Sequence, residues 1–408
     1  MNRAGRFLFM GFLVPDADIG RIFVGEEHPQ FSAIRFQGSL LTALERAGAS
    51  IDAVTTPPIA TFPRNHNWWV SGRRYELAGL RTRGWQISGP NLPGMRNLVR
   101  LIQVVRYGRR VLRLPCEGIL VYSVHTPLVL AALFLKRLTR VPVFVIIPDL
   151  PTFMGGPSHP VKRLMKRVDS AVVRRLLLLT DGAFPITERI GLDWLAGGPP
   201  FFAIEGVSDE SATALSGARS NGSFVFRGPH QPRLLYTGML SQVLGFAHAF
   251  HRSSVDASLV FMGGGEESSQ LQKLADLDGR ITIKPFTTGQ GFAQEVQRAD
   301  FLLNPRDPSW PGARYSFPSK FFEYLSTGKP IVSTRLPGVP DAYFTLFRPV
   351  DMVDQQAFES SLERAIQVDE DPEGIWQAAE LLGQRLTSDV VGRQILRRIC
   401  EWTRTQTE

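Results

Sequence analysis

Short apolar segments alternate with segments of helical periodicity along most of the 408 residues. Residues 6–14 and 49–55 are predicted to be strands, and between them Phe36, Leu40 and Leu44 recur at helical spacing until Gly48. A strand, a helix and a second strand form the beginning of a parallel sheet that helices cover. The alternation therefore predicts an α/β fold.

The same alternation continues through both halves of the chain. In the first half, we expect a helix capped by Thr187 and further elements at residues 97–114 (helix), 118–123, 141–147 and 181–186 (strands). In the second half, strands are predicted at residues 234–237, 259–262, 281–283, 301–303 and 331–334. The chain is thus expected to contain two Rossmann-like units.

One region of the first half does not follow the pattern. Residues 59–94 are rich in Arg, Trp, Pro and Gly, which favours loops with at most one short strand. Its tryptophans, Trp68, Trp69 and Trp85, either contact a bound molecule or pack in the interior, and packing is the favoured alternative.

The junction between the two units is predicted from composition. Residues 208–232 are rich in Ser, Gly, Asn and Arg and have few large apolar residues, which indicates a linker. We therefore expect an N-terminal domain over residues 1–207 and a C-terminal domain over residues 233–386. Residues 387–408 are expected to form a final helix with an apolar stripe of Val391, Ile395, Leu396, Ile399 and Trp402.

The composition excludes several classes of protein. Hydrophobic residues make up 43% and charged residues 21% of the chain, as in an ordinary globular protein. The longest candidate for a membrane span, residues 118–135, is interrupted by His125 and Pro127. We see no secretory signal, and Cys116 and Cys400 show no disulfide or metal pattern. We therefore expect a cytoplasmic protein.

The net charge of +8 favours anionic partners. No nucleic-acid-binding motif is apparent, so an anionic lipid or a phosphorylated substrate is the expected partner. The helices at residues 97–114 and 161–178 combine apolar residues with many arginines and lysines. Such helices can lie on the inner face of the cytoplasmic membrane. A solvated basic face over a packed stripe is the alternative.

Residues 314–330 contain a short predicted helix with both ends marked. Pro318 suits its first turn, with Ser316 or Phe317 as the cap, and Gly328 and Pro330 end it. We expect Phe321, Phe322 and Leu325 to pack on the sheet.

The opposite face of this helix carries Ser319, Lys320 and Glu323, which are three or four positions apart. A cation near a helix N-terminus attracts anions, and a carboxylate one turn later can accept two hydrogen bonds from a vicinal diol. A phosphate site beside a diol site suits a nucleotide-sugar. An ordinary amphipathic surface helix is the alternative.

Other candidates follow predicted strands. Ligands of doubly wound sheets bind beyond the carboxyl ends of the strands. His125 and Asp149 follow strands there, and they either face a ligand or brace their loops. Gly238, Gly263 and Gly264 also follow strands, and glycine lets a ligand approach the backbone closely.

Asn304-Pro305-Arg306, residues 316–324 and residues 328–332 together form a longer motif. This motif resembles the donor-site signature of the family 4 (group 1) glycosyltransferases, in the branch that builds bacterial surface polysaccharides. The resemblance implies the GT-B fold, in which two Rossmann-like domains face a cleft and a C-terminal helix crosses back to the first domain. It also implies transfer with retention of anomeric configuration and without a metal or other cofactor.

The resemblance also assigns roles. Glu323 corresponds to the second of two family carboxylates, whereas the first falls on Tyr315. The basic pair that grips the donor diphosphate falls on Met239 and Leu244. The residues that remain for donor binding are Arg306, Arg314, Ser319 and Lys320 with Glu323 and the glycines.

The catalytic candidates are Arg306 and Lys320, which would stabilise the leaving diphosphate in place of a metal ion. His125 or Asp149 would orient or deprotonate the acceptor hydroxyl, and the donor phosphate is the alternative base.

The expected function is therefore transfer of a hexose from a nucleotide-sugar to a polysaccharide or lipid-linked glycan precursor. Two alternatives stay open: a non-catalytic glycosyltransferase-like scaffold that binds a partner, and a nucleotide-sugar 2-epimerase. The sequence does not specify the sugar, the nucleotide or the acceptor.

Overall fold

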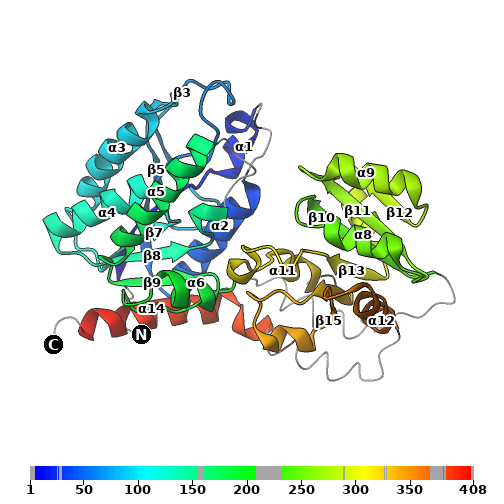
Figure 1. Cartoon of the computed structure of the whole chain (residues 1–408). Helices are drawn as coiled ribbons and strands as arrows, with labels where there is room; N and C mark the ends of the chain where they lie inside the picture. The colour runs from blue at the N-terminus through cyan, green and yellow to red at the C-terminus, as the bar shows by residue number, and fades with distance from the viewer. Residues whose placement is uncertain are drawn as a thin grey trace. The chain divides into compact units, whose positions relative to one another are not determined.

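The computed structural model describes residues 5–24, 26, 30–153, 160–207, 231–287, 290–325, 327, 329–367, 380 and 383–405. The chain divides into two compact units (Figure 1). Unit 1 comprises Met1–Val207 and Leu386–Glu408, and unit 2 comprises Ser208–Arg385. Most of the expected linker, residues 208–230, lies outside the described residues, so its bounds stay a prediction.

Unit 1 is built on a seven-stranded sheet in the order β4-β5-β2-β1-β7-β8-β9. Its pairings are parallel except that β4 pairs antiparallel with β5. The strands are β1 (Arg6–Gly11), β2 (Ser50–Thr55), β4 (Arg73–Glu76), β5 (Arg83–Gln86), β7 (Gly118–Tyr122), β8 (Val143–Ile147) and β9 (Gly182–Pro185). The parallel strands have the doubly wound order of a Rossmann fold, which reverses between β1 and β7.

Helices cover both faces of this sheet (Figure 1). They are α1 (Asp16–Ile22), α2 (Phe31–Arg46), α3 (Met95–Val111), α4 (Thr126–Thr139), the 3-10 turn η1 (Pro151–Phe153), α5 (Pro160–Leu177), α6 (Glu188–Trp194) and α14 (Ser388–Thr405). Thr187 caps α6 through its hydroxyl, as predicted. None of the helices in the described parts of the chain is both long and apolar enough to cross a membrane.

The C-terminal helix α14 belongs to unit 1 and packs against α2. Its apolar stripe is buried as predicted, through Val391, Ile395 and Ile399. The ring of Trp402 lies 5.1 Å from that of Phe184, measured between centroids. The end of the chain therefore completes the core of the unit in which the chain begins.

The expectation for residues 59–94 is wrong. The segment contains four short strands, β3 (Trp69–Val70), β4, β5 and β6 (Gly89–Pro90). β4 and β5 extend the main sheet, while β3 and β6 pair with each other. The sequences of these strands do not alternate between apolar and polar residues, so only their pairing with neighbouring strands identifies them. Trp68 and Trp69 are 59% and 48% exposed, so the packing alternative is wrong for both.

Unit 2 contains a six-stranded sheet in the order β12-β11-β10-β13-β14-β15. All pairings are parallel, and the order again reverses, here between β10 and β13. The strands are β10 (Arg233–Met239), β11 (Ser258–Gly264), β12 (Ile281–Lys284), β13 (Phe301–Asn304), β14 (Ile331–Thr334) and β15 (Phe347–Val350). Together with unit 1, this confirms the predicted pair of Rossmann-like α/β units.

The helices of unit 2 are α8 (Leu244–Arg252), α9 (Ser268–Leu277), α10 (Gln290–Arg298), η2 (Ala313–Tyr315), α11 (Lys320–Leu325), η3 (Asp341–Thr345) and α12 (Gln355–Ala365). Residues of α8, α9 and α12 form one core with the sheet, through Phe246, Phe250, Leu271, Phe358 and Leu362. Burial of these large side chains supplies the main driving force for folding this unit.

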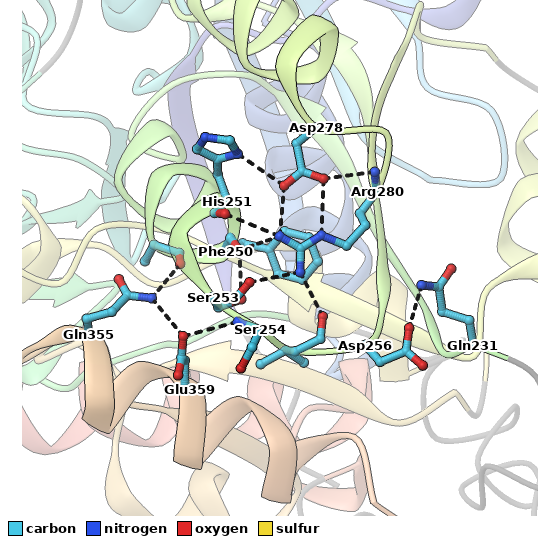
Figure 2. A network of polar contacts seen from close by, with 12 residues as sticks. Gln231, Phe250, His251, Ser253, Ser254, Asp256, Asp278, Arg280, Gln355 and Glu359 are labelled. Atoms are coloured by element: carbon cyan, nitrogen blue, oxygen red, sulfur yellow. Dashed lines mark hydrogen bonds and ion pairs between the residues drawn. The ribbon is translucent and has the colours of Figure 1, made fainter.

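Arg280 joins the start of β12 to the end of α8 (Figure 2). Its guanidinium donates to the carbonyls of Phe250, His251, Ser253 and Val255 at 2.9–3.3 Å. Asp278 accepts from the same guanidinium at 2.8 Å, and this hydrogen bond lowers the pKa of Asp278 to about 2. One arginine thus satisfies the carbonyls that end α8 and begin the turn into β11.

The helix at the predicted donor motif is shorter than expected. α11 begins at Lys320, so Pro318 lies before it rather than in its first turn. Ser316 is not its cap, because it lies four residues before Lys320, and its hydroxyl accepts a hydrogen bond from Arg306 at 2.9 Å. Phe321 and Leu325 are buried as predicted, whereas Phe322 is half-exposed and stacks on Phe317. Gly328, the predicted end signal, lies outside the described residues.

Candidate functional site

The carboxyl end of β10 lies beside the point where the strand order of unit 2 reverses. Gly238 has a φ of 138° there, a conformation that side-chain-bearing residues rarely adopt. A Cβ on Gly238 would lie 3.2 Å from Cε of Lys320 and 3.5 Å from the hydroxyl of Tyr236. Gly238 therefore allows the lysine side chain to lie directly over the strand end.

The other two glycine candidates differ in their surroundings. Gly263 in β11 is opposite Gly238, and a Cβ on it would collide with the carbonyl oxygen of Gly238. Close approach of the two strands is therefore a sufficient reason for glycine there. Gly264 has open space at its Cβ position.

Lys320 and Glu323 lie together on the exposed side of α11. Nζ of Lys320 is 2.7 Å from Oε2 of Glu323, and their side chains are 24% and 45% exposed. The opposite side of the helix is anchored by Tyr324, whose buried hydroxyl accepts a hydrogen bond from the Thr237 amide at 3.1 Å. The packing of Tyr324 therefore holds the cation and the carboxylate at the end of β10.

Arg306 follows β13, the strand on the other side of the reversal point. Its guanidinium donates to Ser316, and its carbonyl accepts from the hydroxyl of Thr334 at 2.6 Å. Burial raises the pKa of Tyr236, and the charge of nearby Arg306 opposes that increase. Arg306 thus lies close to the Tyr236 hydroxyl, which is also near Lys320 over Gly238.

The structure therefore brings Gly238, Arg306, Lys320 and Glu323 to one end of the unit 2 sheet. Ser319 is exposed immediately before α11. Arg314 lies in η2, where its guanidinium carbon is 5.2 Å from the centre of the Tyr315 ring. Tyr315 is the position at which the family resemblance implies a carboxylate. It therefore holds an aromatic ring that faces the Arg314 cation.

Glu267 also lies at this end of the sheet and was not among the predicted site residues. Its carboxylate accepts hydrogen bonds from the amides of Gln242, Val243 and Leu244 at 2.8–2.9 Å. A helix N-terminus attracts anions, and here the carboxylate already occupies the first amides of α8. The signal in the sequence was an acidic residue directly after a glycine-rich strand end, at Gly265-Glu266-Glu267.

Met239 and Leu244 occupy the positions at which the family resemblance implies a basic pair. Met239 is 60% exposed at the end of β10. Leu244 begins α8 and packs against the core of unit 2. Neither side chain carries charge, so within the described residues of this end of the sheet the cations of the motif are Arg306, Arg314 and Lys320.

In unit 1, His125 lies after β7, beside the other reversal point, at the N-cap position of α4, where its side chain makes no capping hydrogen bond. Its ring meets that of Phe12 edge-on, with centroids 5.3 Å apart. Burial, together with the charges of Arg100 and Arg96, lowers the pKa of His125 to about 3. Its Nδ1 is buried and has no hydrogen-bond partner among the described residues. The imidazole is therefore neutral at physiological pH.

Asp149 follows β8, the neighbouring strand, and is exposed. Burial raises the pKa of Tyr122 at the end of β7, and the nearby carboxylate of Asp149 raises it further. Asp149 therefore faces the end of β7 as well as solvent.

Within the described ranges, no group of three or more His, Cys, Asp or Glu side chains is arranged to hold a metal ion. Asp18, in the Asp-x-Asp sequence that begins α1, is buried and ion-paired with Arg73 and Arg21.

Comparison with known proteins places these features in context. Residues 231–366 match the family model described as glycosyl transferases group 1. No curated protein sequence matches the chain. The apo form of the lipopolysaccharide outer core galactosyltransferase WaaB superposes with a TM-score of 0.63 at 12% identity, over 97% of this chain and 99% of that chain.

Two further solved structures are similar over nearly their whole length. HepE of Anabaena in complex with UDP-glucose has a TM-score of 0.57 at 13% identity, over 97% of this chain and 99% of that chain. The trehalose 6-phosphate synthase of Burkholderia multivorans has a TM-score of 0.58 at 12% identity, over 99% of this chain and 98% of that chain.

The similarity to these solved structures shows that the fold is that of the GT-B glycosyltransferases. Within unit 2, residues 231–366 are similar to the group 1 glycosyl transferases.

Proposed function

We propose that the protein is a retaining glycosyltransferase of family 4, which transfers a sugar from a nucleotide-sugar to a polysaccharide or lipid-linked glycan precursor. The observation that carries this proposal is the Lys320–Glu323 pair, which lies at the end of β10 over Gly238. It lies within the segment that matches the group 1 family. The complex of HepE with UDP-glucose supports a nucleotide-sugar as the donor.

In this proposal, the two residues of the pair contact different parts of the donor. The carboxylate of Glu323 accepts hydrogen bonds from the ribose hydroxyls. Lys320 and Arg306 bind the diphosphate, which gains negative charge as the glycosidic bond breaks. Fixed cations at that position stabilise the transition state more than the ground state, and so accelerate the reaction without a metal ion.

The acceptor hydroxyl must lose a proton during transfer. His125 is a poor candidate for the base, because a pKa of about 3 makes its imidazole weakly basic at neutral pH. Its proposed role is therefore to orient the acceptor hydroxyl. Asp149 and the leaving diphosphate are the two remaining bases.

The decisive experiment measures release of nucleoside diphosphate. The whole protein is incubated with UDP-, GDP- and dTDP-sugars, with and without a lipid-linked glycan acceptor. Acceptor-dependent release supports the transferase. Binding of the nucleotide-sugar without release of nucleoside diphosphate would favour the non-catalytic scaffold. That alternative is based on Tyr315, Met239 and Leu244, which differ from the family pattern. Conversion of the donor to its 2-epimer without acceptor would favour the epimerase.

The proposed site of action is the inner face of the cytoplasmic membrane. Helix α4 lies between α3 and α5 (Figure 1), and all three expose large apolar side chains. We call this set the three-helix surface: Leu98 and Ile102 of α3, Phe134 and Leu138 of α4, and Leu164, Met165 and Val168 of α5.

The same helices expose basic side chains, among them Arg106, Arg109, Arg137, Arg163 and Arg167. Exposed apolar residues beside cations are complementary to an anionic lipid surface. A lipid-linked acceptor would be reached from there.

A further inference from the structure

A cavity of about 490 Å³ lies in unit 1 between the second half of α3 and the outer strands β5 and β4. Its volume is within the range of roughly 300–1,000 Å³ that is usual for small-molecule sites. Tyr107 and Arg110 of α3 line it, together with Arg83 and Trp85 of β5 and Arg74 of β4. Trp85, one of the tryptophans considered above as a contact for a bound molecule, is part of this lining, whereas Arg306, Lys320, Glu323, His125 and Asp149 are not.

Two of the arginines in the cavity are neutralised by carboxylates. Arg6 is bound to Asp52, with 2.6 Å between Nε and Oδ2, and it also donates to the carbonyl of Val111 at the end of α3. Arg73 is ion-paired with the buried Asp18. Arg6 thus joins β1 to β2 and α3, and Arg73 joins β4 to α1, so these pairs explain the two arginines without a ligand.

The other three arginines are not neutralised in this way. Arg83 makes only a longer ion pair, with 3.8 Å between its Nε and Oδ1 of Asp52, and that single carboxylate is already bound to Arg6. Among the described residues, Arg74 and Arg110 form no ion pair with a carboxylate, and the guanidinium carbon of Arg110 lies 5.4 Å from the centre of the Tyr107 ring. The cavity therefore has an excess of positive charge, presented by guanidinium groups that bind carboxylate or phosphate in a bidentate manner.

The remaining lining suits a ring with hydroxyl groups. Trp85 and Tyr107 are half-exposed and offer apolar ring surfaces. Ser88 adds a hydroxyl to the wall. A site of this kind, with aromatic surfaces and a few polar groups that fix orientation, is larger than an inorganic anion requires.

We propose that this cavity binds an acidic sugar, that is, a sugar unit that carries a carboxylate or a phosphate group. The arginines Arg74, Arg83 and Arg110 bind the anionic group, and Trp85 and Tyr107 pack against the ring. The proposal depends on the cavity alone, so it does not require the transfer reaction described above.

The test is titration of the whole protein with glucuronic acid, glucose 6-phosphate and neutral glucose, in the presence of saturating UDP. UDP keeps the nucleotide site filled, so that binding there does not contribute. We expect an acidic probe to bind and glucose not to bind. Binding should weaken as salt is added, because the attraction is screened over ~10 Å at 0.1 M ionic strength.

Matched variants locate the binding. Arg110→Ala and Arg74→Ala should each weaken binding of the acidic probe by roughly ten- to a hundredfold, the usual effect of losing a hydrogen bond to a charged group. Arg109→Ala removes the same charge from the adjacent, exposed position of α3 that does not line the cavity, and should leave binding unchanged. Trp85→Leu should weaken binding without changing its salt dependence.

Three results would overturn the proposal. One is that neither acidic probe binds. Another is that glucose binds as tightly as its acidic derivatives. The third is that Arg110→Ala and Arg109→Ala bind the acidic probe equally well while both retain the unfolding temperature of the parent protein.

Discussion

Lys320 and Glu323 form an ion pair on the exposed side of α11, with 2.7 Å between Nζ and Oε2. In the free protein, the two residues that are proposed to bind the donor therefore bind each other. A partly exposed pair of this kind contributes only about 0–1 kcal/mol to stability. A bound donor can therefore replace this ion pair with its own contacts to Lys320 and Glu323 at little cost in free energy. Before the donor binds, the ion pair holds both side chains in position.

Glu323→Ala should weaken binding of nucleoside diphosphate and sugar donor by about 1.5–3 kcal/mol, because a hydrogen bond to a charged group is lost. The ribose contact is made equally in the ground state and the transition state, so KM should rise while kcat stays nearly constant. Titration with UDP and GDP checks this. Glu363→Ala, at an exposed position of α12, is the matched control. Unchanged nucleotide affinity in a folded Glu323→Ala protein would contradict the proposed site.

Lys320→Ala should instead lower kcat by about 100-fold, since the lysine faces charge that develops on the leaving diphosphate. Lys273→Ala removes an exposed lysine from α9 and should leave turnover unchanged. Steady-state kinetics of donor turnover measures both. An ordinary surface helix predicts that neither substitution changes kcat, and that result would remove Lys320 from the mechanism.

Transfer should not require a divalent metal, because Arg306 and Lys320 supply fixed positive charge at the diphosphate. We expect full activity in excess chelator and no stimulation on adding Mg²⁺ or Mn²⁺. Measurement of nucleoside diphosphate release under both conditions decides this. A strict dependence on either ion would show that the two cations do not suffice.

The three-helix surface should bind vesicles that contain anionic lipid, and the binding should weaken with salt. Leu164→Glu places a negative charge on that surface and should reduce sedimentation with anionic vesicles. Leu277→Glu makes the same change at an exposed leucine of unit 2, outside the three-helix surface, and is the control. Equal sedimentation with neutral and anionic vesicles would contradict the proposal.

Arg280→Ala should destabilise unit 2 by about 2–4 kcal/mol, because several backbone carbonyls lose their donor. It should also change the acid response. The pKa of Asp278 is lowered to about 2 in the folded protein, so its stabilising contribution is present above the ordinary pKa of 3.8 and is lost as pH falls towards 2.

Denaturant unfolding at pH 7 and across that acidic range tests both effects. Asp278→Asn is the control, because it removes the titrating group but keeps Arg280. If both variants keep the acid response of the parent protein, the Arg280–Asp278 pair is not its source.

The sequence determined the parts of this protein that depend on local pattern. Buried apolar runs such as β7 and β8 predict strands at the centre of a parallel sheet, because both faces there are covered. The apolar stripe of α14 and the polar pair on α11 follow in the same way from spacing along a helix. These features need no knowledge of distant residues.

Only the tertiary structure decided the features that join distant segments. The capping of α8 by Glu267 links positions 24 residues apart, and Ser316, the residue predicted to cap α11, instead binds the side chain of Arg306. The low pKa of His125 comes from burial beside Phe12 and from the arginines of α3. Burial and charge at a site are set by whatever the fold brings there, so no local pattern in the sequence could reveal them.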